Sequence, residues 1–138
     1  MTDYLDHLKK VPFFSGLNRH ELEQVAQLST ELNISAGTQL ITEGSAAREF
    51  FVIVEGEAEV THEGKHVATV GEGAIQGELS LLLNRPRAAA VTAKTDMVIL
   101  DIDRRSFNAL LDEIPMIARK MLPVVAERLA ANAAAEEH

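Results

Sequence analysis

The stretch GELSLLLNRPRAAAV, residues 77–91, places an acid, Glu78, and a base, Arg87, on either side of an apolar run. A glycine-rich approach to the start of a helix exposes backbone N–H groups, which bind anions. The guanidinium of Arg87 can engage two oxygens of one phosphate, and the carboxylate of Glu78 can accept hydrogen bonds from hydroxyl groups. The pattern therefore indicates a ligand with a phosphate and a neighbouring hydroxyl, as in a nucleotide. The alternative interpretation is a structural salt bridge between Glu78 and Arg87.

Around this stretch, residues 31–103 alternate short β-prone runs with glycine turns. Glycine supplies the positive φ that tight hairpin turns require. Short strands separated by turn signals in this way are typical of an all-β sandwich or a jelly-roll barrel. The runs predicted as strands are ELNI, TQLIT, EFFVIVE, EAEVTH, HVATV, AAAVTAK and DMVILDID.

Helical patterns flank the predicted strands. Within residues 1–30, Asn18 is a good N-cap, and Glu21 completes a capping-box pattern three residues later. Residues 104–138 hold a short helix and then a longer apolar stripe, in which Pro123 should kink or break the helix. No linker or repeat divides the chain, so we expect one mainly β domain over residues 1–138, with flanking α-helices.

The charge and composition oppose several classes of function. A net charge of -8 and a pI near 5.1 argue against binding to nucleic acid or to an anionic membrane. The absence of cysteine excludes disulfides, thiol catalysis and thiolate metal sites. No apolar run has the length of a membrane span, and the N-terminus lacks a signal-peptide pattern, which together favour a cytoplasmic protein.

The other titratable residues show no pattern of a catalytic or metal site. His62 and His66 flank a turn without a third ligand, and we expect both at the surface. Asp101 and Asp103 alternate along a strand, which predicts a solvated face, and Arg104 should start a helix at the surface. An enzyme of the cupin type, which shares a jelly-roll architecture, would need clustered histidine and carboxylate ligands. We therefore predict no enzymatic activity, no metal and no cofactor.

The longer stretch VGEGAIQGELSLLLNRPRAAAVTAKTD, residues 70–96, resembles the phosphate-binding cassette of the cyclic nucleotide-binding domain family. This family includes the regulatory subunit of cAMP-dependent protein kinase and the bacterial catabolite activator protein. The resemblance covers nearly the whole chain and implies an eight-stranded jelly-roll (double-stranded β-helix) barrel over residues 31–103, with the cassette at 71–91. Residues 104–138 would form hinge and lid helices.

The resemblance also implies a role for each matching residue. Glu78 would accept a hydrogen bond from the ribose 2′-hydroxyl, and Arg87 would pair with the cyclic phosphate. Alanine after the arginine, here Ala88, favours cAMP as the ligand, with cGMP as the alternative. Backbone amides around five positions would complete the phosphate cradle: Gly77, Leu79, Ser80, Ala88 and Ala89.

The sequence departs from the family pattern at two positions in or near the cassette. A bulky apolar residue usually precedes the Gly-Glu pair, where this chain has Gln76. An acidic or small polar residue usually follows the loop glycine, where this chain has Ala74. The change at Gln76 bears on ligand affinity more than on the fold.

The resemblance implies that the last helix closes over the base, and Met121, Leu122, Val125 and Arg128 are its candidate contacts. The alternative is that this stripe packs on the strands or on a second copy of the chain, as a homodimer. We expect a stand-alone cyclic nucleotide sensor whose C-terminal helices move on binding and present a changed surface to a protein effector. The alternative hypothesis is a degenerate domain of the same fold that acts as an interaction scaffold without nucleotide.

Overall fold

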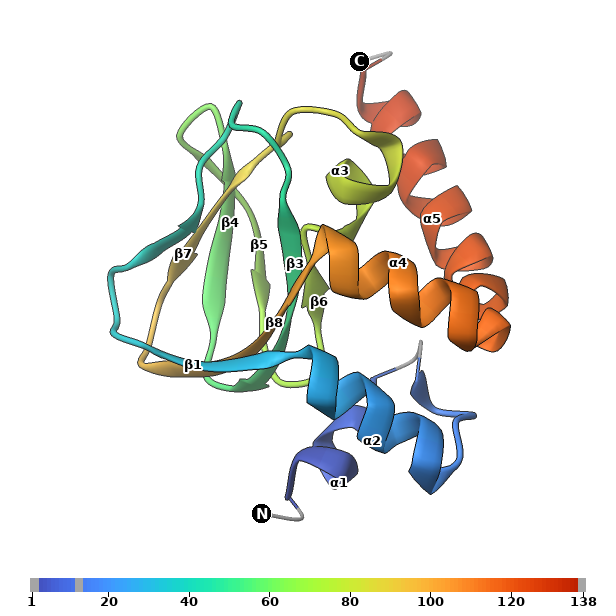
Figure 1. Ribbon diagram of the computed structural model, residues 1–138. Coiled ribbons are helices and arrows are strands. Elements are labelled where there is room, and N and C mark those ends of the chain that lie inside the picture. The colour runs from blue at the N-terminus through green and yellow to red at the C-terminus, as the bar shows by residue number, and fades with distance from the viewer. Residues whose placement is uncertain (1–2, 12–13, 137–138) are drawn as a thin grey trace.

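The computed structural model describes residues 3–11 and 14–136, and its architecture is mainly β with several helices, as predicted (Figure 1). The helices are α1 (Asp3–Lys9), α2 (Arg19–Leu28), α3 (Glu78–Leu83), α4 (Arg104–Glu113) and α5 (Pro115–Glu136). The strands are β1 (Thr30–Ile34), β2 (Gln39–Ile41), β3 (Glu49–Glu55), β4 (Ala58–His62), β5 (Lys65–Val70), β6 (Ile75–Gln76), β7 (Ala90–Ala93) and β8 (Met97–Asp103).

The strands form two four-stranded antiparallel sheets. One sheet has the order β1-β8-β3-β6, and the other has the order β2-β7-β4-β5. The closed barrel expected from the sequence is not confirmed, because no pairing between described strands joins one sheet to the other. The strand runs read from the sequence also missed β6, which has only two residues and pairs with Phe51 and Val52 of β3.

Strand β3 is buried on both faces because each face covers a different hydrophobic core. Phe51 and Ile53 belong to the core between the two sheets. Phe50 and Val52 belong to a larger core that the helices complete. Phe50 meets Phe107 of α4 edge to face, with ring centroids 4.9 Å apart. A strand buried on both faces reads as a continuous apolar run, which explains the sequence FFVIV.

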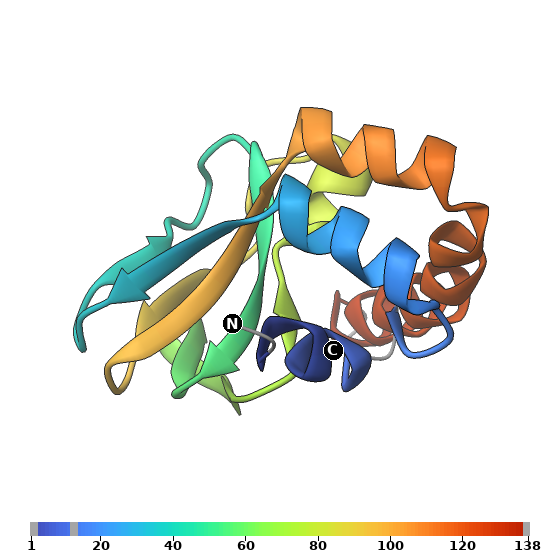
Figure 2. The same ribbon diagram turned by 60° about the horizontal axis from the view of Figure 1, so that its bottom comes forward.

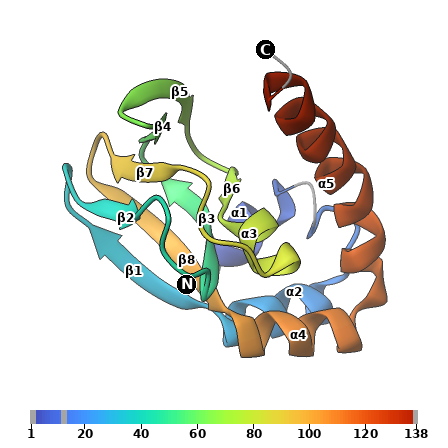
Figure 3. The same cartoon turned by 90° about the horizontal axis from the view of Figure 1, so that it is seen from above.

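The helices gather beside the β1-β8-β3-β6 sheet. Helix α4 packs against α2 and α5, and the two views in Figures 1 and 2 show α2 and α4 side by side. Helix α3 contacts β3, and Figure 3 shows it between the sheets and α5. The short helix of the predicted cassette therefore lies where strands and C-terminal helices meet.

The ends and the interior of the helices test two predictions. The capping box at the start of α2 is confirmed: the Glu21 N–H donates to Asn18 Oδ1 at 2.8 Å, and the Asn18 N–H donates to Glu21 Oε1 at 2.9 Å. Of the expected kink or break at Pro123, the break is wrong, since α5 continues through this residue. Pro123 is exposed, so water can bond the carbonyl that loses its helical N–H partner.

Candidate functional site

Helix α3 begins at a glycine whose backbone conformation is energetically unfavourable for other residues. Gly77 is the N-cap and has φ 94°, in the left-handed region. A Cβ at this position would lie 2.6 Å from Nη1 of Arg87, closer than any side-chain contact allows. Two independent reasons therefore favour glycine at this position. Its φ angle is one that other residues rarely adopt, and the Arg87 guanidinium leaves no room for a side chain.

Arg87 is held in place by backbone groups on both sides. Its side chain is buried, with Nη1 donating to the Gly77 carbonyl at 2.7 Å and Nη2 donating to the Glu49 carbonyl. Its main chain is paired with the β2–β3 loop: the Arg87 N–H donates to the Ser45 carbonyl at 2.8 Å, and the Gly44 N–H donates to the Arg87 carbonyl at 2.7 Å. The guanidinium is thus fixed against the start of α3, nine positions away in sequence from Glu78.

A cavity of about 110 Å³ lies at this place. It brings together six of the seven cassette residues named from the sequence: Gly77, Leu79, Ser80, Arg87, Ala88 and Ala89. The seventh, Glu78, is fully buried in the first turn of α3, where a carboxylate is favoured by the helix dipole.

Four further residues line this cavity, namely Ile41, Val60, Gln76 and Val91. The sequence does not predict Ile41, Val60 or Val91 as site residues. An apolar residue on a strand looks the same whether it contacts a ligand or belongs to the hydrophobic core. Gln76, noted as a departure from the family pattern, is placed at the cavity wall.

Two carboxyl groups lie on the other side of Arg87. Glu49 and Asp101 line a second cavity of about 200 Å³, which Arg87 also lines. Burial, a hydrogen bond with Glu49 and the charges of Glu49 and Asp103 raise the pKa of Asp101 to about 7, against the lowering effect of Arg87. Burial lowers the pKa of Arg87, and Glu49 and Asp101 oppose that shift. The predicted solvated face is therefore wrong for Asp101, which forms an acid pair with Glu49.

Asp103 and Arg104 make structural hydrogen bonds that the sequence does not predict. Asp103 caps α4 by accepting a hydrogen bond from the Ser106 N–H at 2.8 Å, and this bond holds the pKa of Asp103 below its usual range. Arg104 is half-buried and donates to the carbonyls of Leu81 in α3 at 3.1 Å and of Ala47 at 3.0 Å. Arg104 therefore ties the end of the cassette helix to the start of α4, and the predicted surface position is corrected.

The residues expected to form a lid have different environments. Met121 is buried in the larger core, Val125 is half-buried against that core, and Leu122 is 68% exposed. The side chain of Arg128 lies outside the part of the chain that the structure describes. None of the described three lines the cassette cavity, so their contact with a base stays a prediction.

Among residues 3–11 and 14–136, no group of three histidine, aspartate or glutamate side chains is placed to hold a metal ion. None of the helices there combines the length and the apolar character needed to cross a membrane.

Comparison with known proteins identifies the family. A family model described as the cyclic nucleotide-binding domain matches residues 31–114, which contain the cassette and most of the strands. The chain belongs to this family. As a cyclic nucleotide-binding domain, it is similar to the cAMP-dependent protein kinase regulatory subunit of Yarrowia lipolytica, with 39% identity over 113 residues. The match covers 80% of this chain and 30% of that relative, so the chain spans about a third of the relative's length.

Solved structures of similar proteins have the same fold. The cAMP-bound structure of PfPKA-R has a TM-score of 0.79 and 29% identity, covering 94% of this chain and 46% of that one. The regulatory subunit of a cAMP-independent protein kinase A from Trypanosoma brucei has a TM-score of 0.75 and 30% identity. The match covers 86% of this chain and 45% of that one. A mutant of the trypanosomal subunit, with substitutions to alanine, arginine and alanine, is bound to cAMP in its A site.

Proposed function

We propose that this cyclic nucleotide-binding domain is a regulatory sensor that binds cAMP at the cassette cavity. The observation that carries the proposal is the buried Arg87 guanidinium, fixed at the N-terminus of α3 beside a cavity that small residues line in part. A cation and backbone N–H groups suit a cyclic phosphate, and the buried Glu78 carboxylate suits a ribose hydroxyl. In this proposal the domain binds and reports the nucleotide and performs no catalysis.

The choice of cAMP over cGMP is supported by the cassette and by relatives. Ala88 follows Arg87 and lines the cavity. The Yarrowia relative is a cAMP-dependent regulatory subunit, and PfPKA-R is described as cAMP-bound. In the trypanosomal subunit, changes that include one arginine and two alanines accompany cAMP binding. Two of those changes, one to arginine and one to alanine, are at adjacent positions, as Arg87 and Ala88 are in this chain.

The size of the cavity supports movement of the C-terminal helices on binding. Pockets that enclose a drug-sized ligand measure roughly 300–1,000 Å³, whereas the cassette cavity measures about 110 Å³. It has room for only part of a nucleotide, the phosphate and adjoining ribose in this proposal. A helix would have to cover the base from outside, and α5 lies on the side of α3 that faces away from the sheets (Figure 3). Its new position would present a changed surface to a protein effector or to a second copy of the chain.

The second candidate function is a scaffold that binds no cyclic nucleotide. Gln76 favours it, because a polar side chain lines the cavity where the family usually has an apolar one. The trypanosomal subunit supports it too, as a structurally similar domain in a cAMP-independent protein. The scaffold would present the same helices to a partner with no ligand control.

Calorimetric titration with cAMP, cGMP and 5′-AMP separates the two functions. A sensor should bind cAMP with a Kd near ~1 μM, about −8 kcal/mol, and 5′-AMP much more weakly. Arg87→Ala should lose at least ~1.5–3 kcal/mol, roughly tenfold or more in affinity, because a charged hydrogen bond to the phosphate is removed.

Arg85→Ala is the matched control, since Arg85 is an exposed cation two residues away in the same loop and does not line the cavity. It should bind cAMP like the wild type. No heat with any of the three nucleotides would favour the scaffold. Equal affinity of Arg87→Ala and the wild type would refute the assignment of the phosphate to Arg87.

A further inference from the structure

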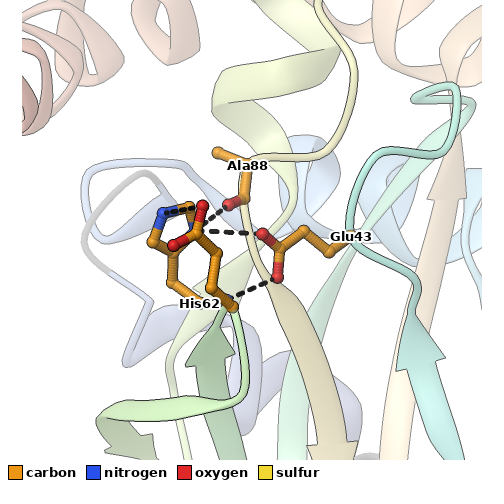
Figure 4. Close-up of polar contacts among 4 residues, drawn as sticks. Glu43, His62 and Ala88 are labelled. Atoms are coloured by element: carbon orange, nitrogen blue, oxygen red, sulfur yellow. Dashed lines mark hydrogen bonds and ion pairs between the residues drawn. The ribbon is translucent and has the colours of Figure 1, made fainter.

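A histidine from a neighbouring strand contacts the main chain of the cassette. His62 is the last residue of β4, which pairs with β7 so that Thr61 lies opposite Ala90. One residue further along β4, the ring of His62 reaches the segment before β7, and its Nδ1 lies 2.9 Å from the Ala88 carbonyl oxygen (Figure 4). Ala88 directly follows Arg87 and lines the cassette cavity.

Glu43 orients the His62 ring. Glu43 Oε2 lies 3.1 Å from the same Nδ1 atom, as Figure 4 shows. Both neighbours of Nδ1, a carbonyl and a carboxylate, accept hydrogen bonds, so Nδ1 must carry the proton that they share. The Glu43 carboxylate is fixed in turn, because its Oε1 accepts the Glu63 N–H at 3.0 Å. Glu43 thus contacts both the β4–β5 turn and His62, and His62 contacts the cassette.

Fixing the Ala88 carbonyl also fixes the next amide. A trans peptide is planar, and its C=O and N–H groups point in opposite directions. The Ala89 N–H is consequently held pointing away from His62. The preceding peptide is held in the same manner, because the Gly44 N–H bonds the Arg87 carbonyl at 2.7 Å and so sets the direction of the Ala88 N–H. Adjacent residues of one loop, Glu43 and Gly44, thus act on two successive peptides of the cassette.

We propose that His62, oriented by Glu43, is a positioning residue of the phosphate site: its Nδ1–H holds the Ala88 carbonyl and thereby aims the Ala89 N–H at an anionic cyclic phosphate. This inference rests on the proposed function. His62 does not itself contact the ligand, and its effect passes through one peptide plane. A strand residue at the rim of the cassette thus contributes to affinity for the phosphate.

His66 provides a matched control on the adjacent strand. Its side chain is 55% exposed, against 56% for His62, and its recorded ion-pair partner is Glu59 at 3.7 Å, away from the cassette. The test compares the full chain with His62→Leu, His62→Asn, Glu43→Gln and His66→Leu. Asparagine places its Nδ2 donor close to where histidine has Nδ1, so His62→Asn can restore the bond to the carbonyl.

Two measurements are made on each variant. The first is the ¹³C shift of the Ala88 carbonyl without nucleotide, which should move in His62→Leu, return toward the wild-type value in His62→Asn and stay unchanged in His66→Leu. The second is the Kd for cAMP and for its two exocyclic phosphorothioate diastereomers. Loss of a neutral hydrogen bond should weaken cAMP binding by about 3- to 10-fold in His62→Leu and less in Glu43→Gln, with His62→Asn close to wild type.

The ratio of Kd values for the two diastereomers separates positioning from a general loss of structure. A misdirected amide affects one exocyclic oxygen, so this ratio should change in His62→Leu and not in His66→Leu. Equal cAMP affinity of His62→Leu and wild type would overturn the inference, and so would a loss that His62→Asn does not restore or that leaves the ratio unchanged. If the wild type binds neither cAMP nor cGMP, the proposed function fails and the positioning role fails with it, which is a different result from binding that His62 does not influence.

Discussion

At the scale of single residues, Arg87 is the point where buried charges meet. It is buried between the start of α3 on one side and the Glu49–Asp101 acid pair on the other. A buried cation needs compensation, which comes from the carbonyls of Gly77 and Glu49 and from the two carboxyl groups. A hydrogen bond between Glu49 and Asp101 requires one of them to hold a proton. Asp101, with a pKa raised to about 7, therefore responds to pH near neutrality.

The free energy of unfolding should decrease as pH rises, because Asp101 loses its proton. Its pKa is about 7 in the folded protein, against an ordinary value of 3.8. The folded state therefore binds more protons than the unfolded state between these values, and the free energy of unfolding falls as pH rises from about 4 to about 7. Asp101→Asn removes the titrating group, so urea denaturation at pH 5 and pH 8 should show a smaller difference than in the wild type.

Asp103→Asn is the control, because the pKa of Asp103 is shifted downward and asparagine also caps helices well. Its contribution is present above the ordinary pKa and is lost only as pH falls below that value. The difference in stability between pH 5 and pH 8 should shrink less than in Asp101→Asn, because the charge of Asp103 is only one of several causes that raise the pKa of Asp101. An Asp101→Asn variant that keeps the wild-type difference would show that Asp101 does not titrate in this range.

Gly77 separates backbone strain from displacement of Arg87. Gly77→Ala and Gly37→Ala both place a Cβ on left-handed backbone, at φ 94° and 90°, which costs about 1–2 kcal/mol. A Cβ at Gly37 would meet nothing within 4 Å, whereas one at Gly77 would displace the Arg87 guanidinium. Thermal denaturation should therefore show a larger loss for Gly77→Ala, and calorimetry should show weaker cAMP binding in that variant alone. Equal effects of both substitutions on binding would contradict this arrangement.

At the scale of elements, most features that depend on neighbouring residues could be predicted from the sequence, and contacts between distant residues could not. The Asn18–Glu21 capping box and the apolar run of β3 depend on neighbouring residues, so the sequence displays them directly. The spacing of the cassette residues is distinctive enough to predict them from the sequence, and six of the seven line one cavity, while their binding roles stay a prediction. Arg104 bonds the end of α3 across 23 positions, and Glu49 pairs with Asp101 across 52 positions. No sequence pattern extends over such separations, so these contacts could not be predicted.

The two errors about element boundaries have different physical causes. Strand β6 was not predicted because two residues cannot show an alternating pattern, and its pairing with β3 depends on the tertiary structure. The break at Pro123 was predicted from the usual cost of proline inside a helix. Helix α5 tolerates this residue because its early turns are anchored by burial of Ile117 and Met121 in the larger core. Tertiary packing thus outweighs the local preference of Pro123, whereas β6 has no local pattern to detect.

At the scale of the whole molecule, α5 links the site to the rest of the chain. Its first half is anchored in the core, while Leu122 is 68% exposed. The chain contains no tryptophan, so Leu122→Trp introduces a single indole reporter on this helix. If α5 closes over the base, the indole should leave water, and its fluorescence emission should shift to shorter wavelength when cAMP is added.

The reporter distinguishes closure of α5 from binding without movement. Met116→Trp places the same probe on the first turn of α5, at a residue that is 42% exposed and next to the buried Ile117, and its emission should change less. Leu122→Trp combined with Arg87→Ala should show no shift, because the phosphate contact that starts closure is removed. A calorimetrically confirmed cAMP complex whose Leu122→Trp emission equals that of the free protein would contradict closure at this position. The domain would then pass its signal through α3, Arg104 and α4, which are joined without α5.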